Sequence, residues 1–225
     1  MRNPWIDLPR QPPYLLPADA SVFDRHPRIA ANIRFDLLPA PFMGRPDAAV
    51  VLLALNPGAK TNYDAYGAAF VEACRAEMLF QSRVPFGAMN PAHSMTPGYG
   101  YWNARLRRLC EHVGRSVLLQ QLLCVQFFPY QSQEFRALPE HLPSQRFGFD
   151  LVRRAVSEGR LVIVLRSLRL WQTAVPELGN ADIIGLRSPR SPYLTANNMG
   201  DENFRRVVER LREASQTKTL GPRHR

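Results

Sequence analysis

The strongest constraint on the fold is an apolar run from Ala48 to Leu55 that ends in Asn56-Pro57-Gly58. A stretch of this length without a polar residue is typical of a strand covered on both faces, as in a parallel sheet. Pro57 and Gly58 stop strand pairing and favour a tight turn. Because ligands of open α/β sheets bind at the carboxyl ends of strands, Asn56 is the first candidate for a chemical role. The alternative is an Asx turn that caps the next segment.

Strand-like and helix-like segments alternate along the rest of the chain. Further strands are predicted at Leu122–Phe127, Leu161–Leu165 and Asp182–Leu186, and helices over 64–80, 101–113, 144–158 and 201–214, with a short one through Trp171. This alternation predicts an α/β fold, a three-layer α/β/α sandwich around a mostly parallel sheet of about four strands. Residues 1–47 are expected to form a Pro-rich arm packed on the domain (48–214), with a short helix around Arg28–Leu37. Residues 215–225 are expected to be a disordered basic tail.

The charge balance favours a polyanionic partner. The chain has 29 Lys and Arg against 19 Asp and Glu, a net charge of +10, which is most simply matched by nucleic acid. Its three cysteines are too few for an iron–sulfur cluster and fit a reducing compartment. The histidines lack metal-ligand spacing, and no signal peptide or membrane span is evident. We therefore expect a cytoplasmic monomer without a cofactor, a metal or a membrane partner.

Four motifs lie at or near the expected strand ends. They are Leu55-Asn56-Pro57-Gly58, then Val84-Pro85-Phe86-Gly87, then Gln126-Phe127-Phe128-Pro129, and finally Ser188-Pro189-Arg190-Ser191-Pro192 with Ala196-Asn197-Asn198-Met199-Gly200. In this order they resemble the motifs of the uracil-DNA glycosylase superfamily, closest to its single-strand-selective monofunctional branch. The resemblance covers residues 48–212 and is most specific in the first and last motifs.

The resemblance implies a monofunctional DNA glycosylase that flips uracil, or another deaminated or damaged base, out of DNA and hydrolyses its N-glycosidic bond. Asn56 would orient the attacking water, and Phe86 would stack on the base. The rest of the base pocket would be Leu55, Gly58, Tyr66, Gln126 and Phe128. The residues contacting DNA, either single-stranded or duplex, would be Lys60, Arg187, Ser188, Arg190, Ser191 and Tyr193. Arg190, with Tyr193 or Leu194, would fill the gap that the base leaves.

The chain departs from the family pattern at two functional positions. Gln126 stands where the family has the Asn that reads the base edge, and Leu186 and Arg187 stand where its last motif begins with a His. His93 and His141 are candidates to replace that His. Two other functions remain open: a related protein that binds nucleic acid or a nucleotide without cleaving it, and an enzyme of the same fold acting on an unrelated small molecule. Phe86 can also be read as a core aromatic, and 188–192 as only a rigid turn.

Overall fold

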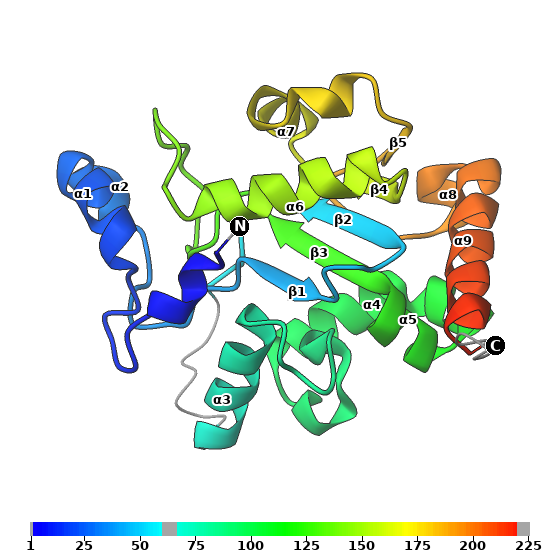
Figure 1. The fold of residues 1–225 in the computed structure, drawn as a ribbon, viewed down its shortest axis with the longest axis horizontal. Coiled ribbons are helices and arrows are strands. Elements are labelled where there is room, and N and C mark those ends of the chain that lie inside the picture. The colour runs from blue at the N-terminus through cyan, green and yellow to red at the C-terminus, as the bar shows by residue number, and fades with distance from the viewer. Residues whose placement is uncertain (1, 60–66, 220–225) are drawn as a thin grey trace, which may run out of the picture.

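The computed structural model describes residues 2–59 and 67–219 and shows an α/β fold around a five-stranded sheet (Figure 1). The strands are β1 (Phe42–Gly44), β2 (Val50–Ala54), β3 (Leu122–Gln126), β4 (Leu161–Val164) and β5 (Ile183–Gly185), in the order β1-β3-β2-β4-β5. The pairs β2–β3, β2–β4 and β4–β5 are parallel, whereas β1 runs antiparallel to β3. Lys60 and Tyr66, predicted to contact the DNA and the base, lie outside the described residues.

The sheet is mixed, so the prediction of a mostly parallel sheet of about four strands was wrong. The additional strand, β1, belongs to the segment predicted to be an irregular arm. It has only three residues, and its hydrophobic pattern is too short to be recognised. The pairing of β1 with β3 requires glycine at position 44. Gly44 has a φ of +103°, and a Cβ added there would clash with the carbonyl oxygen of Leu122. Flanking prolines suit an edge strand of this kind.

The larger helices agree with the expected alternation, whereas those over 115–121 and 196–199 were not predicted and the arm and the carboxyl end differ. They are α1 (Pro17–Arg25), α2 (Pro27–Ala30), α3 (Gly67–Met78), α4 (Pro97–Val113), α5 (Arg115–Gln121), α6 (Gln145–Ser157), α7 (Leu168–Ala174), α8 (Ala196–Met199) and α9 (Asp201–Thr219). The 3-10 helices are η1 (Pro4–Asp7), η3 (Gly87–Met89), η4 (Pro91–His93) and η5 (Pro176–Gly179). The helix predicted around 28–37 is present only at its start, where α2 ends at Ala30, and α9 continues past residue 214. No described helix is both long and apolar enough to cross a membrane.

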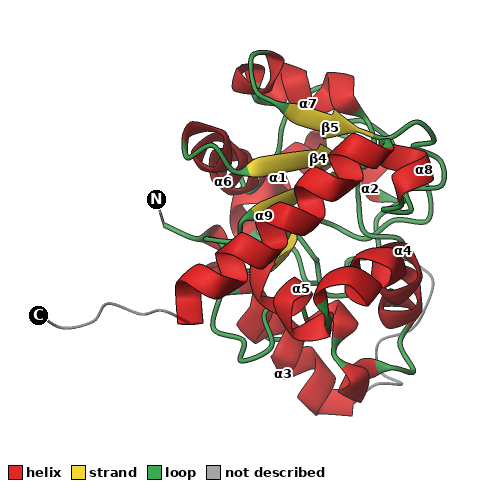
Figure 2. Ribbon diagram, turned by 90° about the vertical axis from the view of Figure 1, so that its right-hand side faces the viewer, coloured by secondary structure: helices red, strands yellow, loops and turns green. Residues whose placement is uncertain are grey.

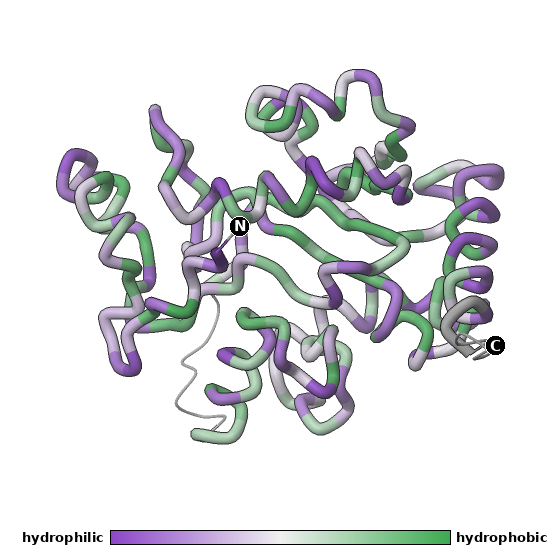
Figure 3. Tube along the Cα trace, viewed as in Figure 1, coloured by the Kyte–Doolittle hydropathy of each residue, from purple (hydrophilic) through white to green (hydrophobic). Residues whose placement is uncertain are grey.

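Side chains of alternate strand residues pack in two hydrophobic cores, one on each face of the sheet. Val51 and Leu53 of β2 belong to the core shared with α6, α7 and the arm, whereas Val50 and Leu52 belong to the core shared with α4, α5 and α9. Helices α4, α5 and α9 pack on one another (Figure 2). Figure 3 shows the central strands as continuously hydrophobic, while α9 alternates between polar and apolar residues. Burial on both faces explains why β2 is an unbroken apolar run.

The arm is fixed to the domain by a buried carboxylate. Asp19 of α1 has no exposed surface. Its Oδ2 accepts a hydrogen bond from the Tyr130 hydroxyl at 2.7 Å, and its Oδ1 accepts one from the backbone N–H of Ser144 at 3.0 Å. The Tyr130 hydroxyl in turn accepts a hydrogen bond from the backbone N–H of Leu16. A buried carboxylate needs such partners, so the arm and the segment after β3 hold each other in place.

The long segment after α3 is anchored by Glu77. The Oε1 atom of Glu77 accepts a hydrogen bond from the backbone N–H of Gly87 at 2.8 Å. Glu77 is buried beside a hollow of ≈ 210 Å³, which Arg45 and Asp47 also line. Burial raises the pKa of the Glu77 carboxyl from 4.5 to about 8, although hydrogen bonds from the backbone of Gly87 and Gly44 act in the opposite direction.

Replacing Glu77 by Gln is expected to remove a pH dependence of stability. Because the pKa of Glu77 is raised in the folded state, the protonated carboxyl stabilises the folded protein fully below pH 4.5. This contribution to the free energy of unfolding is lost as the pH rises through about 8. Between about pH 5 and about pH 9, the free energy of unfolding in urea should fall more for the wild type than for Glu77→Gln, by on the order of a few kcal/mol. Glu72→Gln, exposed on the same helix, is the control and should behave like the wild type. Parallel curves for the wild type and Glu77→Gln would contradict the expectation.

Candidate functional site

The strand order brings the carboxyl ends of β2, β3 and β4 together. From β2 the chain crosses to β3 on one side and, after β3, returns to β4 on the other side of β2. Pairing continues beyond the strands: the N–H of Phe128 donates to the carbonyl of Leu55 at 2.8 Å, and the N–H of Leu165 donates to the carbonyl of Leu53 at 2.9 Å. The end of β2 is therefore a topological switch point, the position at which open α/β sheets bind ligands.

Asn56 lies at this switch point with its side chain held in one orientation. Its Nδ2 donates to Ser132 Oγ at 3.0 Å and to the carbonyl of Pro57 at 3.2 Å. Ser132 is itself buried and forms backbone bridges to Gly58 and Ile33. Since both donor contacts are made by Nδ2, the Oδ1 atom is the one available as an acceptor, and no described residue donates to it. Sequence reasoning missed Ser132, which lies 76 residues from Asn56 and outside the recognised motifs.

Gln126 lies on the neighbouring strand end with an unsatisfied amide. It is the register partner of Ala54 and therefore lies two residues before the level of Asn56. Its side chain is 9 % exposed, and its Oε1 is buried without a hydrogen-bond partner in the described part of the chain. Leaving such an atom unpaired costs about 1–3 kcal/mol, so this oxygen is a candidate to accept a hydrogen bond from a ligand.

The aromatic residues predicted for the base pocket are core residues in this structure. Phe86 has no exposed surface and packs edge-on against Trp102 at 5.3 Å between ring centroids. Phe128 is 3 % exposed and lies among aromatic rings that include Phe23. Neither ring offers a face to a base in this conformation, because both are enclosed by apolar neighbours. The stacking role predicted for Phe86 is thus corrected to a packing role.

The other two pocket candidates differ in exposure. Leu55 is half-buried against the core on the α6 face, and its carbonyl is occupied by the pairing with β3. Gly58 is exposed, and an added Cβ there would meet nothing within 4 Å. The backbone of a ligand can therefore approach Gly58 closely. The structure itself does not require glycine at that position, because a side chain would also fit.

The loop after β5 gathers most of the residues predicted to contact DNA. Residues 187–195 and the start of α8 border a hollow of ≈ 350 Å³, whose lining is Arg187, Ser188, Ser191, Tyr193, Thr195, Asn197 and Asn198. Arg187, Ser188, Arg190, Ser191 and Tyr193 are all exposed. Leu194, the alternative for filling the gap left by a base, is only 1 % exposed and belongs to the core. It is therefore excluded from that role in this conformation.

The loop is shaped from within by Asn198. The Oδ1 of this buried side chain accepts a hydrogen bond from the N–H of Ser188 at 2.8 Å, and its Nδ2 donates to the carbonyls of Ser191 and Tyr193, each at 3.0 Å. The last motif of the sequence includes Asn198, but nothing in the sequence showed that its side chain supports the loop. The reading of 188–192 as a rigid turn is compatible with this geometry.

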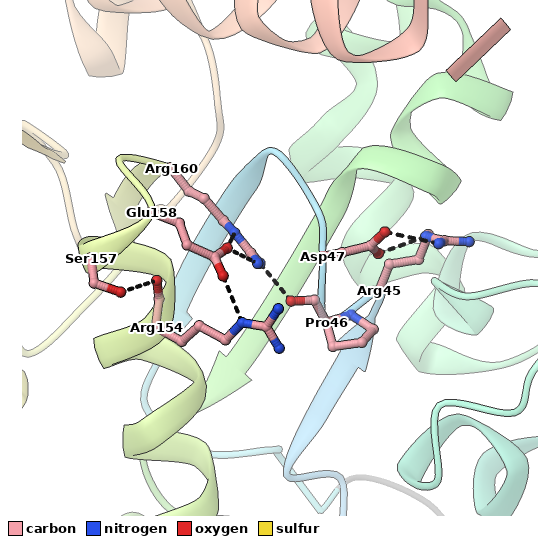
Figure 4. Close-up of polar contacts among 7 residues, drawn as sticks. All are labelled: Arg45, Pro46, Asp47, Arg154, Ser157, Glu158 and Arg160. Carbon is pink, nitrogen blue, oxygen red and sulfur yellow. Dashed lines mark hydrogen bonds and ion pairs between the residues drawn. The ribbon is translucent and has the colours of Figure 1, made fainter. Parts of the chain in front are cut away.

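Arginines at the two ends of the sheet differ in their partners. At the amino end Arg45 pairs with Asp47, and Glu158 pairs with both Arg154 and Arg160 (Figure 4). Towards the carboxyl end, the arginines that form no ion pair with a carboxylate within residues 2–59 and 67–219 include Arg105, Arg166, Arg187 and Arg190. Positive charge without an internal counter-ion therefore remains at the end that carries Asn56, which suits an anionic partner.

The histidines proposed as substitutes have other surroundings. His93 Nδ1 lies 3.2 Å from the carbonyl oxygen of Gly87, and its ring packs edge-on against Phe70. His141 packs against Phe149, and burial lowers its pKa. Their known contacts are with core aromatics and loop backbone, not with the amides at the strand ends. Over the described ranges, no group of three or more His, Cys, Asp or Glu residues could hold a metal ion.

Replacing Asn198 by Ala should loosen the loop without disturbing the sheet. The change removes three hydrogen bonds from buried or partly buried groups, which should lower the free energy of unfolding by about 2–3 kcal/mol. Hydrogen exchange should become faster at the Ser188 amide but stay slow in β2 and β3. Asn197→Ala, at an exposed neighbouring side chain, should leave both measurements unchanged. Unaltered exchange at Ser188 in Asn198→Ala would show that the loop is held by other contacts.

Comparison of the chain with protein-family models, with curated proteins and with solved structures finds no match. Its function therefore has to be argued from the geometry of its own residues and from the motifs noted in its sequence.

Proposed function

We propose that this chain is a monofunctional DNA glycosylase that removes uracil or another deaminated or damaged base, and that its helix-covered sheet is the three-layer α/β/α sandwich of the uracil-DNA glycosylase superfamily. The observation that carries the proposal is the buried, unpartnered Oε1 of Gln126 beside the end of β2. A base edge with an N–H donor would satisfy this atom, as the imide of uracil would. A flipped base is read by such contacts to its edge.

Asn56 supplies the second group that the reaction needs. Its Nδ2 is engaged by Ser132 and Pro57, so its Oδ1 is free to accept a hydrogen bond from a water molecule. In hydrolysis, that water attacks the sugar carbon C1′ while the bond from C1′ to the base nitrogen breaks and its electron pair leaves with the base. The water's proton passes to solvent, and the departing base anion takes up a proton from solvent. An amide cannot act as a strong base near neutral pH, so Asn56 contributes by orientation.

DNA binding is supported by the loop after β5 and by the charge around it. The hydroxyls of Ser188 and Ser191 line the same hollow as Arg187. Hydroxyl, amide and guanidinium donors are the usual partners of phosphate oxygens. The Arg187 side chain donates to the carbonyl of Asn197 at 3.0 Å. This contact places it among the lining residues of the hollow and favours a phosphate role over a contact with the departing base.

A second candidate function, nucleic-acid binding without cleavage, is favoured by one observation. Leu186, at the position where the resembling family has its His, is 9 % exposed and packs in the core. An apolar buried side chain can neither donate a proton nor stabilise a departing anion. Among the site residues that the structure describes, Asn56 is then the one left to accelerate the reaction, and the rate of excision would be correspondingly low.

An excision assay tests the proposal. The purified chain is incubated with oligonucleotides that carry uracil, hypoxanthine, xanthine or a mismatch, and abasic sites are detected by alkaline cleavage. We expect excision by the wild type and a loss of about 10²-fold or more in Asn56→Ala. Gln126→Ala should change the preference among the bases, because it removes the group that reads the base edge.

Two amide variants away from the site are matched controls. Asn180→Ala alters an exposed residue after η5, and Gln120→Ala alters an amide at the opposite end of the sheet. Both should retain wild-type excision. Salt-sensitive DNA binding without abasic sites on any substrate would reject the glycosylase in favour of the second candidate. Excision that persists in Asn56→Ala would reject the role given to Asn56.

Ser132→Ala is expected to act through Asn56. Loss of the Ser132 hydroxyl removes one of the two hydrogen bonds that Asn56 Nδ2 donates, which allows the Asn56 amide to rotate. We expect kcat for excision to fall about tenfold while KM changes little, because the orientation of the water is lost and DNA binding is retained. Ser116→Ala, at an exposed position of α5, is the control. A change in KM alone would contradict a positioning role for Ser132.

A further inference from the structure

Helix α4 and the loop after β5 meet in a sandwich of one arginine and two tyrosines. The guanidinium carbon of Arg105 lies 3.4 Å from the ring centroid of Tyr101 and 5.2 Å from that of Tyr193. The backbone also connects the two elements, because the N–H of Leu194 donates to the carbonyl of Arg105 at 3.0 Å. The two rings are thus held at fixed positions although they are 92 residues apart in a chain of 225.

Both tyrosines remain partly exposed to solvent. Tyr101 and Tyr193 are each 41 % exposed, whereas most large aromatic residues of the described chain are buried. Single exposed apolar residues are normal on a protein surface, but these two rings lie on one arginine and together keep apolar area in water. Their arrangement is typical of a prepared contact surface.

The surroundings of the sandwich are positive and belong to the same end of the molecule as Asn56. Arg166 follows β4 and donates to the carbonyls of Pro189 and Arg190, each at 3.4 Å. Burial raises the pKa of the Tyr101 hydroxyl, and the charges of Arg105 and Arg166 act in the opposite direction, which places both arginines near it. Arg105 has no carboxylate partner among the described residues, and its Nε is buried without a hydrogen-bond partner.

We propose that Tyr101 and Tyr193, held by Arg105, form a stacking surface for unpaired nucleobases, with the phosphates of the same strand bound by Arg166 and Arg190. Exposed aromatic rings beside a basic groove or patch are the general means of binding single-stranded nucleic acid, because every base offers a flat face. In a duplex those faces are covered by neighbouring bases. The inference rests on the proposed function for the chemistry of its partner, but it requires no excision.

Binding of undamaged DNA tests this surface separately from catalysis. Fluorescence anisotropy would measure the affinity of the full chain for a labelled oligothymidine strand and for a duplex of the same length, at low and moderate salt. We expect Tyr101→Ala and Tyr193→Ala each to weaken single-strand binding about tenfold and duplex binding less than about twofold. Tyr101→Phe and Tyr193→Phe, which keep the ring, should bind like the wild type.

Tyr99→Ala is the matched control. Tyr99 lies on the same helix and also stacks with an arginine, Arg115, at 5.6 Å, but it is not part of the sandwich. Thermal unfolding of each variant checks its fold, and Tyr101→Leu, which keeps bulk without an aromatic face, replaces Tyr101→Ala if that variant unfolds early.

The possible outcomes separate this inference from the glycosylase. Equal weakening of single-strand and duplex binding would overturn it, because the rings would then serve phosphate contacts only. Unchanged binding in Tyr101→Ala, or no binding by the wild type, would overturn it as well. The expected pattern together with an absence of abasic sites would support the stacking surface and reject only the proposed excision. The binding of Asn180→Ala, at the exposed position after η5, to undamaged strands should equal that of the wild type in every case.

Discussion

β2 pairs in parallel with β3 on one side and with β4 on the other, and Val50 to Leu53 have no exposed surface. Hydrogen bonds and packing on both faces leave this strand no freedom of register, because a shift by one residue would exchange its two faces. Asn56 therefore has a fixed starting point, two residues beyond the strand. Everything inferred about the site, from the Ser132 contact to the neighbouring amide of Gln126, depends on that fixed end.

The sequence predicts the parts of the fold that repeat a pattern over many residues. The parallel strands and the larger helices follow from apolar runs and helical periodicity, and their observed bounds differ from the predicted ones mainly at the ends. β1 could not be predicted in this way, because its three residues pair through the main chain and through the conformation of Gly44. The helix predicted near 28–37 ends at Ala30, and Phe35 beyond it packs against Tyr130 without helical geometry.

The candidate site was predictable where it lies on a strand end and unpredictable where it depends on tertiary contacts. Asn56 lies two residues beyond the apolar strand β2 and Gln126 is the last residue of β3, so their position at the strand ends could be inferred from the chain alone. The burial of Phe86 against Trp102 could not, since an aromatic in a loop looks the same whether it faces a pocket or the core. Ser132, Asn198 and Arg105 support functional groups distant in sequence, and no local pattern identifies such partners.

The contacts of Asp19 have a consequence for how the protein is made. Its partners Tyr130 and Ser144 lie 111 and 125 residues further along the chain. At a synthesis rate of about 5–20 residues per second, the arm emerges from the ribosome roughly 6–25 s before those partners exist. During that interval Phe23 can pack against Phe35 within the arm, but Trp5, Leu16 and Phe23 lack the Tyr130 side chain that they contact or adjoin in the folded protein. The arm therefore reaches its final packing only after β3 and the segment that follows it have been made.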